Sequence, residues 1–177
     1  FRPASLSERV AREGPLEPVE TARLLEQLLE GLARLHRAGV AHGRLHPDHV
    51  LVDGTGSGLQ IRLGGLLQTA AGVEIADPAF LAPEQAKRGA DSLAADVWSV
   101  GAVTYFALVG AGPYVASSRA SLIGAVEAAR PPSIMALRPA ARRFDPVLRA
   151  CLEPEAADRA PSADLVLALL ADGPEER

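Results

Sequence analysis

Histidines are concentrated in one short stretch of this chain. All four of them, His36, His42, His46 and His49, lie within fourteen positions. Imidazole nitrogens are common zinc ligands, and the last three residues together with the carboxylate of Asp48 would form a zinc site if the fold brought them together. A metal site, or an enzymatic activity built on His42, His46 and His49, is therefore one chemistry that this stretch could support.

The order of residues in the same stretch offers a second interpretation. Residues 42–52 read HGRLHPDHVLV and resemble the catalytic loop of Hanks-type Ser/Thr protein kinases, whose pattern is His-Arg-Asp-Leu-Lys-Pro-Glu-Asn. In that family the Asp accepts the proton of the substrate hydroxyl and the Asn binds magnesium. Arg44 and His49 occupy these positions here, and His46 occupies that of the Lys. A guanidinium is not a base at neutral pH, and magnesium prefers oxygen ligands to imidazole. The resemblance implies a loop that keeps its shape without its reactive groups.

The resemblance to the C-terminal lobe of these kinases extends over nearly the whole chain. The segment that ends at Gly65 resembles the strand leading into the Asp-Phe-Gly metal motif, which places Gly65, Leu66 and Leu67 at its three positions and leaves no carboxylate for a metal. Residues 77–84 resemble the Ala-Pro-Glu end of an activation segment, and residues 96–101 resemble the start of the long central helix of the lobe. The resemblance implies structural roles for His42, Glu84, Asp96, Trp98 and Arg159.

Each of these structural roles is a specific expectation. In the kinase frame, His42 should support the loop from inside the lobe, and Asp96 should accept hydrogen bonds from the backbone around His42. Glu84 and Arg159 should form a buried ion pair that joins the end of the activation segment to the helices near the C-terminus.

Composition agrees with the loss of the usual catalytic groups. The chain contains no asparagine and a single lysine, Lys87, in a polar, turn-like stretch where we expect it to be solvated. The kinase frame explains the loop histidines without a metal, so metal binding is the less favoured interpretation, and Asp48 and Asp53 are expected to be solvated turn carboxylates. We therefore expect a pseudokinase that is not an enzyme, with no cofactor, no bound metal and no binding of magnesium ATP.

The activation segment offers few positions for control by phosphorylation. Between Gly65 and Glu84 the only residue with a hydroxyl group is Thr69. Gly43 stands where the resemblance places the arginine that receives a phosphate. We expect Arg44 to fill the empty catalytic cleft, paired with a nearby acid, and a contact with a phosphate on Thr69 is the alternative.

Length and charge limit the number of domains and the kinds of partner. The 177 residues, of which 48% are hydrophobic, suffice for one buried domain, and we expect residues 1–177 to form a single kinase-like C-terminal lobe. Because residues 1–6 resemble the segment after the interlobe hinge, the N-terminal lobe is expected to be absent from this chain. A formal net charge of −4 argues against nucleic acid as the main partner. The lone cysteine, Cys151, excludes an intrachain disulfide and favours a cytoplasmic setting, and the use of Arg in place of Lys suggests a GC-rich bacterial genome.

Hydrophobic periodicity predicts a mainly α fold, a helical bundle around a central buried helix with one short β-hairpin. Leucines that recur three or four residues apart predict a buried helix over residues 18–39. Residues 49–53 and 59–63 should pair across a glycine-rich turn. Shorter amphipathic stretches predict helices around residues 122–126, 147–152 and 165–170.

Residues 97–116 carry no charged side chain and reach the length of a membrane span. Glycines and a proline interrupt the stretch, and the flanking Lys/Arg asymmetry that orients membrane spans is missing. We expect this segment to be the central helix, apolar on all sides because other helices surround it, and we expect no membrane span.

Together these observations predict a catalytically inactive lobe that binds proteins as a scaffold or allosteric regulator in bacterial signalling. Such a lobe normally packs its upper face against an N-terminal lobe, so we expect a protein partner to cover the apolar surface there. Two alternatives stay open. In the first, the chain is the residual lobe of a larger kinase or pseudokinase assembly. In the second, it is a metal-binding protein or a repurposed enzyme that uses the cluster of His42, His46 and His49.

Overall fold

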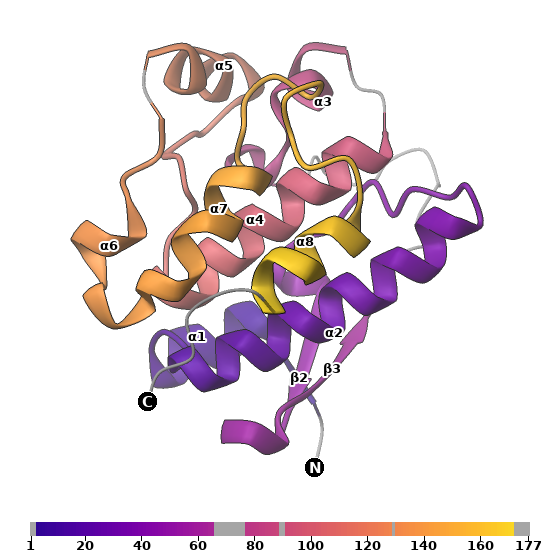
Figure 1. The fold of residues 1–177 in the computed structure, drawn as a ribbon. Coiled ribbons are helices and arrows are strands. Elements are labelled where there is room, and N and C mark those ends of the chain that lie inside the picture. Colours follow the sequence, from indigo (N-terminus) through magenta and orange to yellow (C-terminus); the bar gives the residue numbers. More distant parts are fainter. Residues whose placement is uncertain (1–2, 66–76, 89–90, 129, 172–177) are drawn as a thin grey trace.

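The computed structural model describes residues 3–65, 77–88, 91–128 and 130–171 (Figure 1). Helices dominate these residues, and the only described strands form one small sheet. The elements are β1 (Ala4–Ser5), α1 (Leu6–Glu13), α2 (Pro18–Arg37), β2 (Val50–Asp53), β3 (Gln60–Leu63), α3 (Pro83–Arg88), α4 (Leu93–Val109), α5 (Arg119–Ala128), α6 (Ile134–Leu137), α7 (Asp145–Cys151) and α8 (Ala163–Ala171).

Helix α4 lies at the centre of the fold because its apolar residues surround the whole helix. Nearly all of its side chains are buried, and α2 and α7 pack against it (Figure 1). The helix begins after Ser92, whose Oγ accepts a hydrogen bond from the N–H of Ala95. It ends at Gly110, whose φ of 82° lies in the left-handed region that glycine adopts readily. The central helix predicted from residues 97–116 is thus confirmed as far as Val109, and no helix in the described ranges is long and apolar enough to cross a membrane.

Helix α2 supplies the second large apolar surface of the core. Its start is stabilised by a backbone hydrogen bond from Glu17 N–H to the carboxylate of Glu20, at 3.1 Å. The helix packs against both α4 and α8. The predicted helix is confirmed, and it ends at Arg37, two residues before Gly39. Its leucines Leu24, Leu25, Leu28, Leu29 and Leu32 have no exposed surface.

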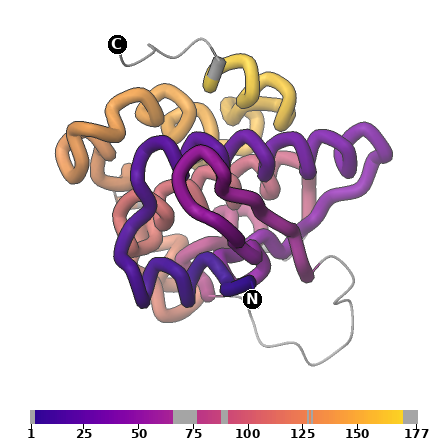
Figure 2. Tube along the Cα trace, turned by 90° about the horizontal axis from the view of Figure 1, so that it is seen from below, coloured from indigo at the N-terminus to yellow at the C-terminus, as the bar shows by residue number. Residues whose placement is uncertain are grey.

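The predicted hairpin is confirmed as β2 and β3, which pair antiparallel with Val50 opposite Leu63. A third strand, β1, adds to the free edge of β2, and was not predicted because two residues carry no periodicity. Figure 2 shows the hairpin lying against α2. The Gln27 amide joins the two, since it donates to the carbonyl of Leu59 at 2.9 Å and accepts from the N–H of Ile61 at 3.1 Å.

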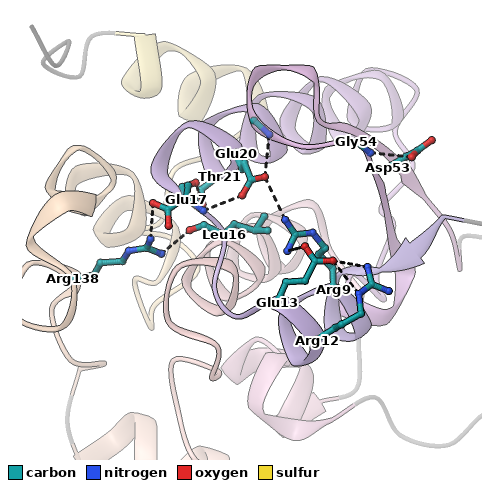
Figure 3. Close-up of polar contacts among 11 residues, drawn as sticks. Arg9, Arg12, Glu13, Leu16, Glu17, Glu20, Thr21, Asp53, Gly54 and Arg138 are labelled. Atoms are coloured by element: carbon teal, nitrogen blue, oxygen red, sulfur yellow. Dashed lines mark hydrogen bonds and ion pairs between the residues drawn. The ribbon is translucent and has the colours of Figure 1, made fainter.

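The side chains of Glu20 and Arg138 link the region around the α1–α2 connection to residues that are distant in sequence (Figure 3). The buried carboxylate of Glu20 accepts a hydrogen bond from the N–H of Gly56, in the β2–β3 turn, at 3.0 Å. The guanidinium of Arg138 donates to the carbonyl of Leu16 at 2.6 Å and to that of Leu108, near the end of α4, at 3.1 Å. The bond to Leu108 satisfies one of the carbonyl groups that the end of α4 leaves without a helical partner.

Helices α5, α7 and α8 lie where the amphipathic stretches predicted them. Helix α3 was not predicted. It contains Lys87, so the expectation of a turn there is wrong. The resemblance placed residues 77–84 at the end of an activation segment and implied no helix there. Pro83 suits the first turn of a helix, where its missing N–H costs nothing.

Candidate functional site

A buried carboxylate at the start of α4 holds the backbone of the kinase-like loop. Asp96 has no exposed surface. Its Oδ2 accepts the N–H of His42, and its Oδ1 accepts the N–H of Gly43, both at 2.7 Å. The ring Nε2 of His36 lies 2.9 Å from the same carboxylate. Three donors therefore converge on Asp96, which satisfies a charge that would be costly to bury alone.

The His42 ring connects the loop to the segment after β3. Its Nδ1 accepts the N–H of Arg44 at 3.4 Å, so the neutral ring carries its proton on Nε2, which donates to the carbonyl of Gly64 at 3.0 Å. Burial lowers the pKa of His42 below its ordinary value. This geometry matches the supporting position that the resemblance implies for this residue.

The backbone of Arg44 lies between two imidazoles. The Nδ1–H of His49 donates to the carbonyl of Arg44 at 2.6 Å, while His42 accepts its N–H. The Arg44 side chain is partly buried. Its guanidinium makes no hydrogen bond or ion pair with any residue in the described ranges. The expectation that Arg44 pairs with a nearby acid is therefore not met by the described residues.

Gly65 lies directly against the His49 ring. Its φ is +83°, and a Cβ built on it would lie 2.9 Å from the ring atoms Cγ and Nδ1 of His49. The imidazole thus occupies the space in which an aspartate at position 65 would begin. Leu66, Leu67 and Thr69 lie outside the described residues.

His46 packs beside the end of the activation segment. Its ring meets that of Phe80 edge-on, with centroids 4.6 Å apart, and lies 6.2 Å from the ring of His49. The Nδ1 of His46 accepts the N–H of Asp48 at 3.2 Å. Burial lowers the pKa of His46, and its Nε2 is buried without a hydrogen-bond partner among the described residues.

Among the described residues, the side chains of Asp48 and Asp53, the two acids expected to be solvated, make polar contacts only with residues that are close to them in sequence. The Asp48 side chain is 60% exposed, and Asp53 accepts the N–H of the adjacent Gly54. Within the described part of the chain, no three His, Cys, Asp or Glu side chains are grouped so that they could hold a metal ion.

The remaining predicted residues meet at a second cluster, formed by Glu84, Trp98 and Arg159. The Arg159 side chain is fully buried and donates to both carboxylate oxygens of Glu84, at 2.7 and 3.1 Å. It also donates to the carbonyl of Ala94 at 2.7 Å. Its guanidinium carbon lies 5.2 Å from the ring centroid of Trp98, which stacks on Tyr114. Glu84 is 26% exposed, so only the arginine side of this pair is fully buried.

Sequence reasoning missed His36, Gln85 and Asp91. The Gln85 amide donates to the carbonyl of Gly43 at 2.9 Å and to the carboxylate of Asp91 at 3.0 Å. A Cβ on Gly43, whose φ is +73°, would lie 2.5 Å from the Asp91 carboxyl carbon. A side chain at position 43 would therefore require the Asp91 carboxylate to shift and would be strained by the positive φ. No periodicity marks these contacts, although the polar type of Gln85 beside buried neighbours was a usable signal.

The comparisons with known proteins agree with this geometry. A sequence profile described as "Protein kinase domain" matches residues 1–177. Over 121 residues the chain is 38% identical to "CBL-interacting protein kinase 17" of Oryza sativa subsp. japonica, a match that spans 62% of this chain and 26% of that protein. Over 124 residues it is 32% identical to "Serine/threonine-protein kinase PknL" of Mycobacterium tuberculosis, spanning 67% of this chain and 31% of that protein.

The solved kinase domain of Mycobacterium tuberculosis PknI has the same fold. It superposes with a TM-score of 0.73 at 23% identity, and the match covers 97% of this chain and 63% of that chain. The chain therefore spans about a third or less of the curated relatives and less than two thirds of the solved domain.

These comparisons overturn the expectation that the chain is not an enzyme. That expectation rested on a few positions, chiefly Arg44, His49 and Gly65. The family match instead rests on the whole length, and the relatives are named as serine/threonine protein kinases. The substituted loop residues are differences within an enzyme family, and they do not place the chain outside it. The chain belongs to the protein kinase domain family.

Proposed function

We propose that this chain acts in protein phosphorylation signalling as a protein-binding lobe, with the role of a scaffold or allosteric regulator. One observation carries the proposal. The loop backbone is held in place by Asp96 and His42, while Arg44 and His49 stand where the family has its acid and its metal-binding amide. A loop that keeps its shape while its reactive side chains change is expected when binding depends on that shape.

The proposed partner is a protein that covers the face of the lobe beside β1 and α1. We call this the upper face because we infer that it is the one that packs against an N-terminal lobe in kinases. A cavity of about 950 Å³ opens there, and it offers both apolar and charged surface to a partner. The net charge of −4 favours a protein over nucleic acid. The residues that line the cavity are Pro3, Ala4, Glu8, Ala11, Arg12 and Leu51.

Phosphate transfer to Ser or Thr is the second candidate function. The names of the relatives favour it, since both PknL and the CBL-interacting kinases are named as protein kinases. For this function the residue that accepts the hydroxyl proton is not Arg44, because a guanidinium stays protonated at neutral pH.

Several finer statements belong to the same proposal. We infer a single C-terminal-lobe domain over residues 1–177, and structural roles for the Asp96 and Glu84–Arg159 contacts. A bacterial origin is supported by the use of Arg in place of Lys and by the mycobacterial relatives. A cytoplasmic setting is supported by the lone cysteine.

The partner proposal is tested by affinity capture of the intact protein with quantitative mass spectrometry. Leu51→Glu places a charge in the upper cavity, and Leu165→Glu places the same charge on α8, where Leu165 is already 45% exposed. We expect the same partner to be captured by the parent and by Leu165→Glu and to be lost from Leu51→Glu, with thermal melts confirming that both variants fold. Equal capture by Leu51→Glu would contradict a partner on this face.

A phosphotransfer assay on the same preparations separates the two candidate functions. Transfer of labelled phosphate from ATP to a protein Ser or Thr would support the second function. Specific capture with no such transfer would support the first function alone.

A further inference from the structure

The Arg44 guanidinium is the one charged group of the kinase-like loop that the contacts of the described residues leave unexplained. It is partly buried, and it has no hydrogen bond or ion pair with any residue of the described ranges. Withdrawing a charge from water is costly unless an opposite charge compensates it. A partly buried arginine with no anion among the described residues therefore indicates a place where an anion binds.

Among the described residues, no carboxylate near the loop pairs with Arg44, and each of them has another partner or is solvated. Asp96 accepts three hydrogen bonds, and Asp91 accepts one from Gln85. Asp77 caps the turn at the N–H of Ala79. The Asp48 side chain is mostly exposed to solvent.

The loop also fixes the position from which the Arg44 side chain extends. Its N–H and its carbonyl are each bonded to a histidine ring, and one of those rings is in turn bonded to the carbonyl of Gly64. A side chain on a backbone held in this way loses less freedom when it binds, because the backbone is already ordered.

We propose that Arg44 binds the phosphate of a phosphorylated Ser or Thr side chain on a bound protein. This inference rests on the proposed protein-binding function and names the group that the lobe recognises. The planar guanidinium donates two parallel hydrogen bonds to phosphate oxygens, and a phosphate monoester carries up to two charges and three acceptor oxygens where a carboxylate has one charge and two. The relatives are named as serine/threonine kinases, so phosphorylated Ser and Thr are the side chains that their chemistry produces.

The test uses the intact protein and three fluorescent pools of degenerate peptides, with a central phosphoserine, serine or glutamate. Fluorescence anisotropy should show saturable binding of the phosphoserine pool, at least tenfold tighter than of either other pool. Arg44→Ala should weaken this binding at least tenfold. Arg44→Lys, which keeps the charge but loses the fork of donors, should bind with intermediate affinity.

Arg62→Ala is the matched control, since it removes one positive charge from an exposed site on β3 and should leave binding unchanged. Inorganic phosphate should compete only at far higher concentration than the peptide pool. Equal affinity for the phosphoserine and serine pools, or unchanged binding by Arg44→Ala, would overturn the proposal. Equal affinity for glutamate would assign the site to carboxylates instead, and equally tight binding of inorganic phosphate would assign it to the free ion.

Failure of this inference is distinguishable from failure of the proposed function. If Arg44→Ala and the parent capture the same partner through the upper face, and neither prefers the phosphoserine pool, only the phosphate inference is wrong. If no partner is captured by any variant, the protein-binding function itself is wrong.

Discussion

Asp96, at the start of α4, and Arg44, in the kinase-like loop, are charged residues with opposite surroundings. Asp96 is completely buried and receives two backbone N–H groups and a histidine ring. Arg44 is partly buried, and its guanidinium donates no hydrogen bond to any described residue. The fold compensates the charge of Asp96, whereas no described residue compensates that of Arg44.

The two residues should therefore differ in their effect on stability. In Asp96→Ala the N–H groups of His42 and Gly43 lose their acceptor, which should cost about 2–6 kcal/mol and lower the Tm by roughly 5–20 °C. Arg44→Ala should change stability by less than about 0.5 kcal/mol, because no folded-state contact of the described residues is lost. Thermal melts and hydrogen exchange of the loop amides check both. Unchanged loop protection in Asp96→Ala would show that the carboxylate does not hold the loop.

The contact between Gly65 and His49 predicts that a side chain at position 65 is tolerated better when residue 49 is smaller. Gly65→Asp alone should lower the Tm, because its Cβ would lie 2.9 Å from the His49 ring. In the double variant with His49→Asn, the smaller side chain should remove most of that loss. The strain of the positive φ is modest for an aspartate, which tolerates the left-handed region better than most residues. Equal losses in the single and double variants would mean that the ring moves away freely.

One buried histidine, His42, and one partly buried histidine, His46, predict a loss of stability in mild acid. Burial holds the pKa values of His42 and His46 below their ordinary value of 6.5. Because the unfolded chain binds protons first, the stability from these neutral rings is present above pH 6.5 and is lost as the pH falls below it. The Tm should therefore fall between pH 7 and 5, and less steeply in His46→Gln, which does not titrate. A His46→Gln profile with the parent slope would exclude His46 as a contributor.

At the scale of elements, the ion pair of Glu84 and Arg159 joins α3 to the segment before α8. Four groups share the Arg159 guanidinium, namely the Glu84 carboxylate and the carbonyls of Ala94, Glu153 and Pro154. Its face covers the ring of Trp98 in α4. One side chain thereby connects parts of the chain that are far apart in sequence.

Loss of that connection should destabilise the whole lobe. Glu84→Ala leaves the buried Arg159 charge without its carboxylate, and because Glu84 is 26% exposed we expect a cost at the lower end of the range for a broken buried pair, roughly 2–3 kcal/mol. The matched control is Arg130→Ala, which breaks the pair with Glu153 and removes an arginine side chain that is 65% exposed. The control should leave the free energy of unfolding nearly unchanged, because water and salt screen an exposed pair. Chemical denaturation measures both, and equal costs would place Glu84 among ordinary surface pairs.

At the scale of the whole molecule, the core extends from α1 to α8 as one connected cluster. Cys151 lies in it with no exposed surface, against Gly101 of α4, where an added Cβ would meet the Cys151 Cβ at 2.6 Å. Packing this close leaves no room for a modifying reagent.

Cys151 should therefore report global unfolding. Burial raises the pKa of its thiol to about 12, so the reactive thiolate is scarce at pH 8 in the folded chain. Labelling by iodoacetamide should follow the unfolding transition in denaturant and should be negligible in its absence. Rapid labelling of the folded protein would reveal a local opening between α4 and α7.

The sequence by itself predicted the larger elements and their order, but not β1, α1, α3 or α6. Leucine spacing marked α2, alternating residues and glycines marked the β2–β3 hairpin, and the apolar run identified the central helix. These patterns are local, because a helix or hairpin buries one face of a short segment. The two-residue strand β1 and the short helix α3 carried too few residues to show a period.

Only the tertiary structure decided which side chains meet. His36 reaches Asp96 across 60 positions, the His49 ring fills the space beside Gly65, and Arg44 remains without an acid among the described residues. The substitution at Arg44 suggested that this kinase-like chain is not an enzyme, and the family match together with the relatives named as serine/threonine protein kinases corrected that prediction. Periodicity indicates which face of a helix or strand is buried. Which side chains meet on that face depends on how distant segments pack, and no local pattern encodes this.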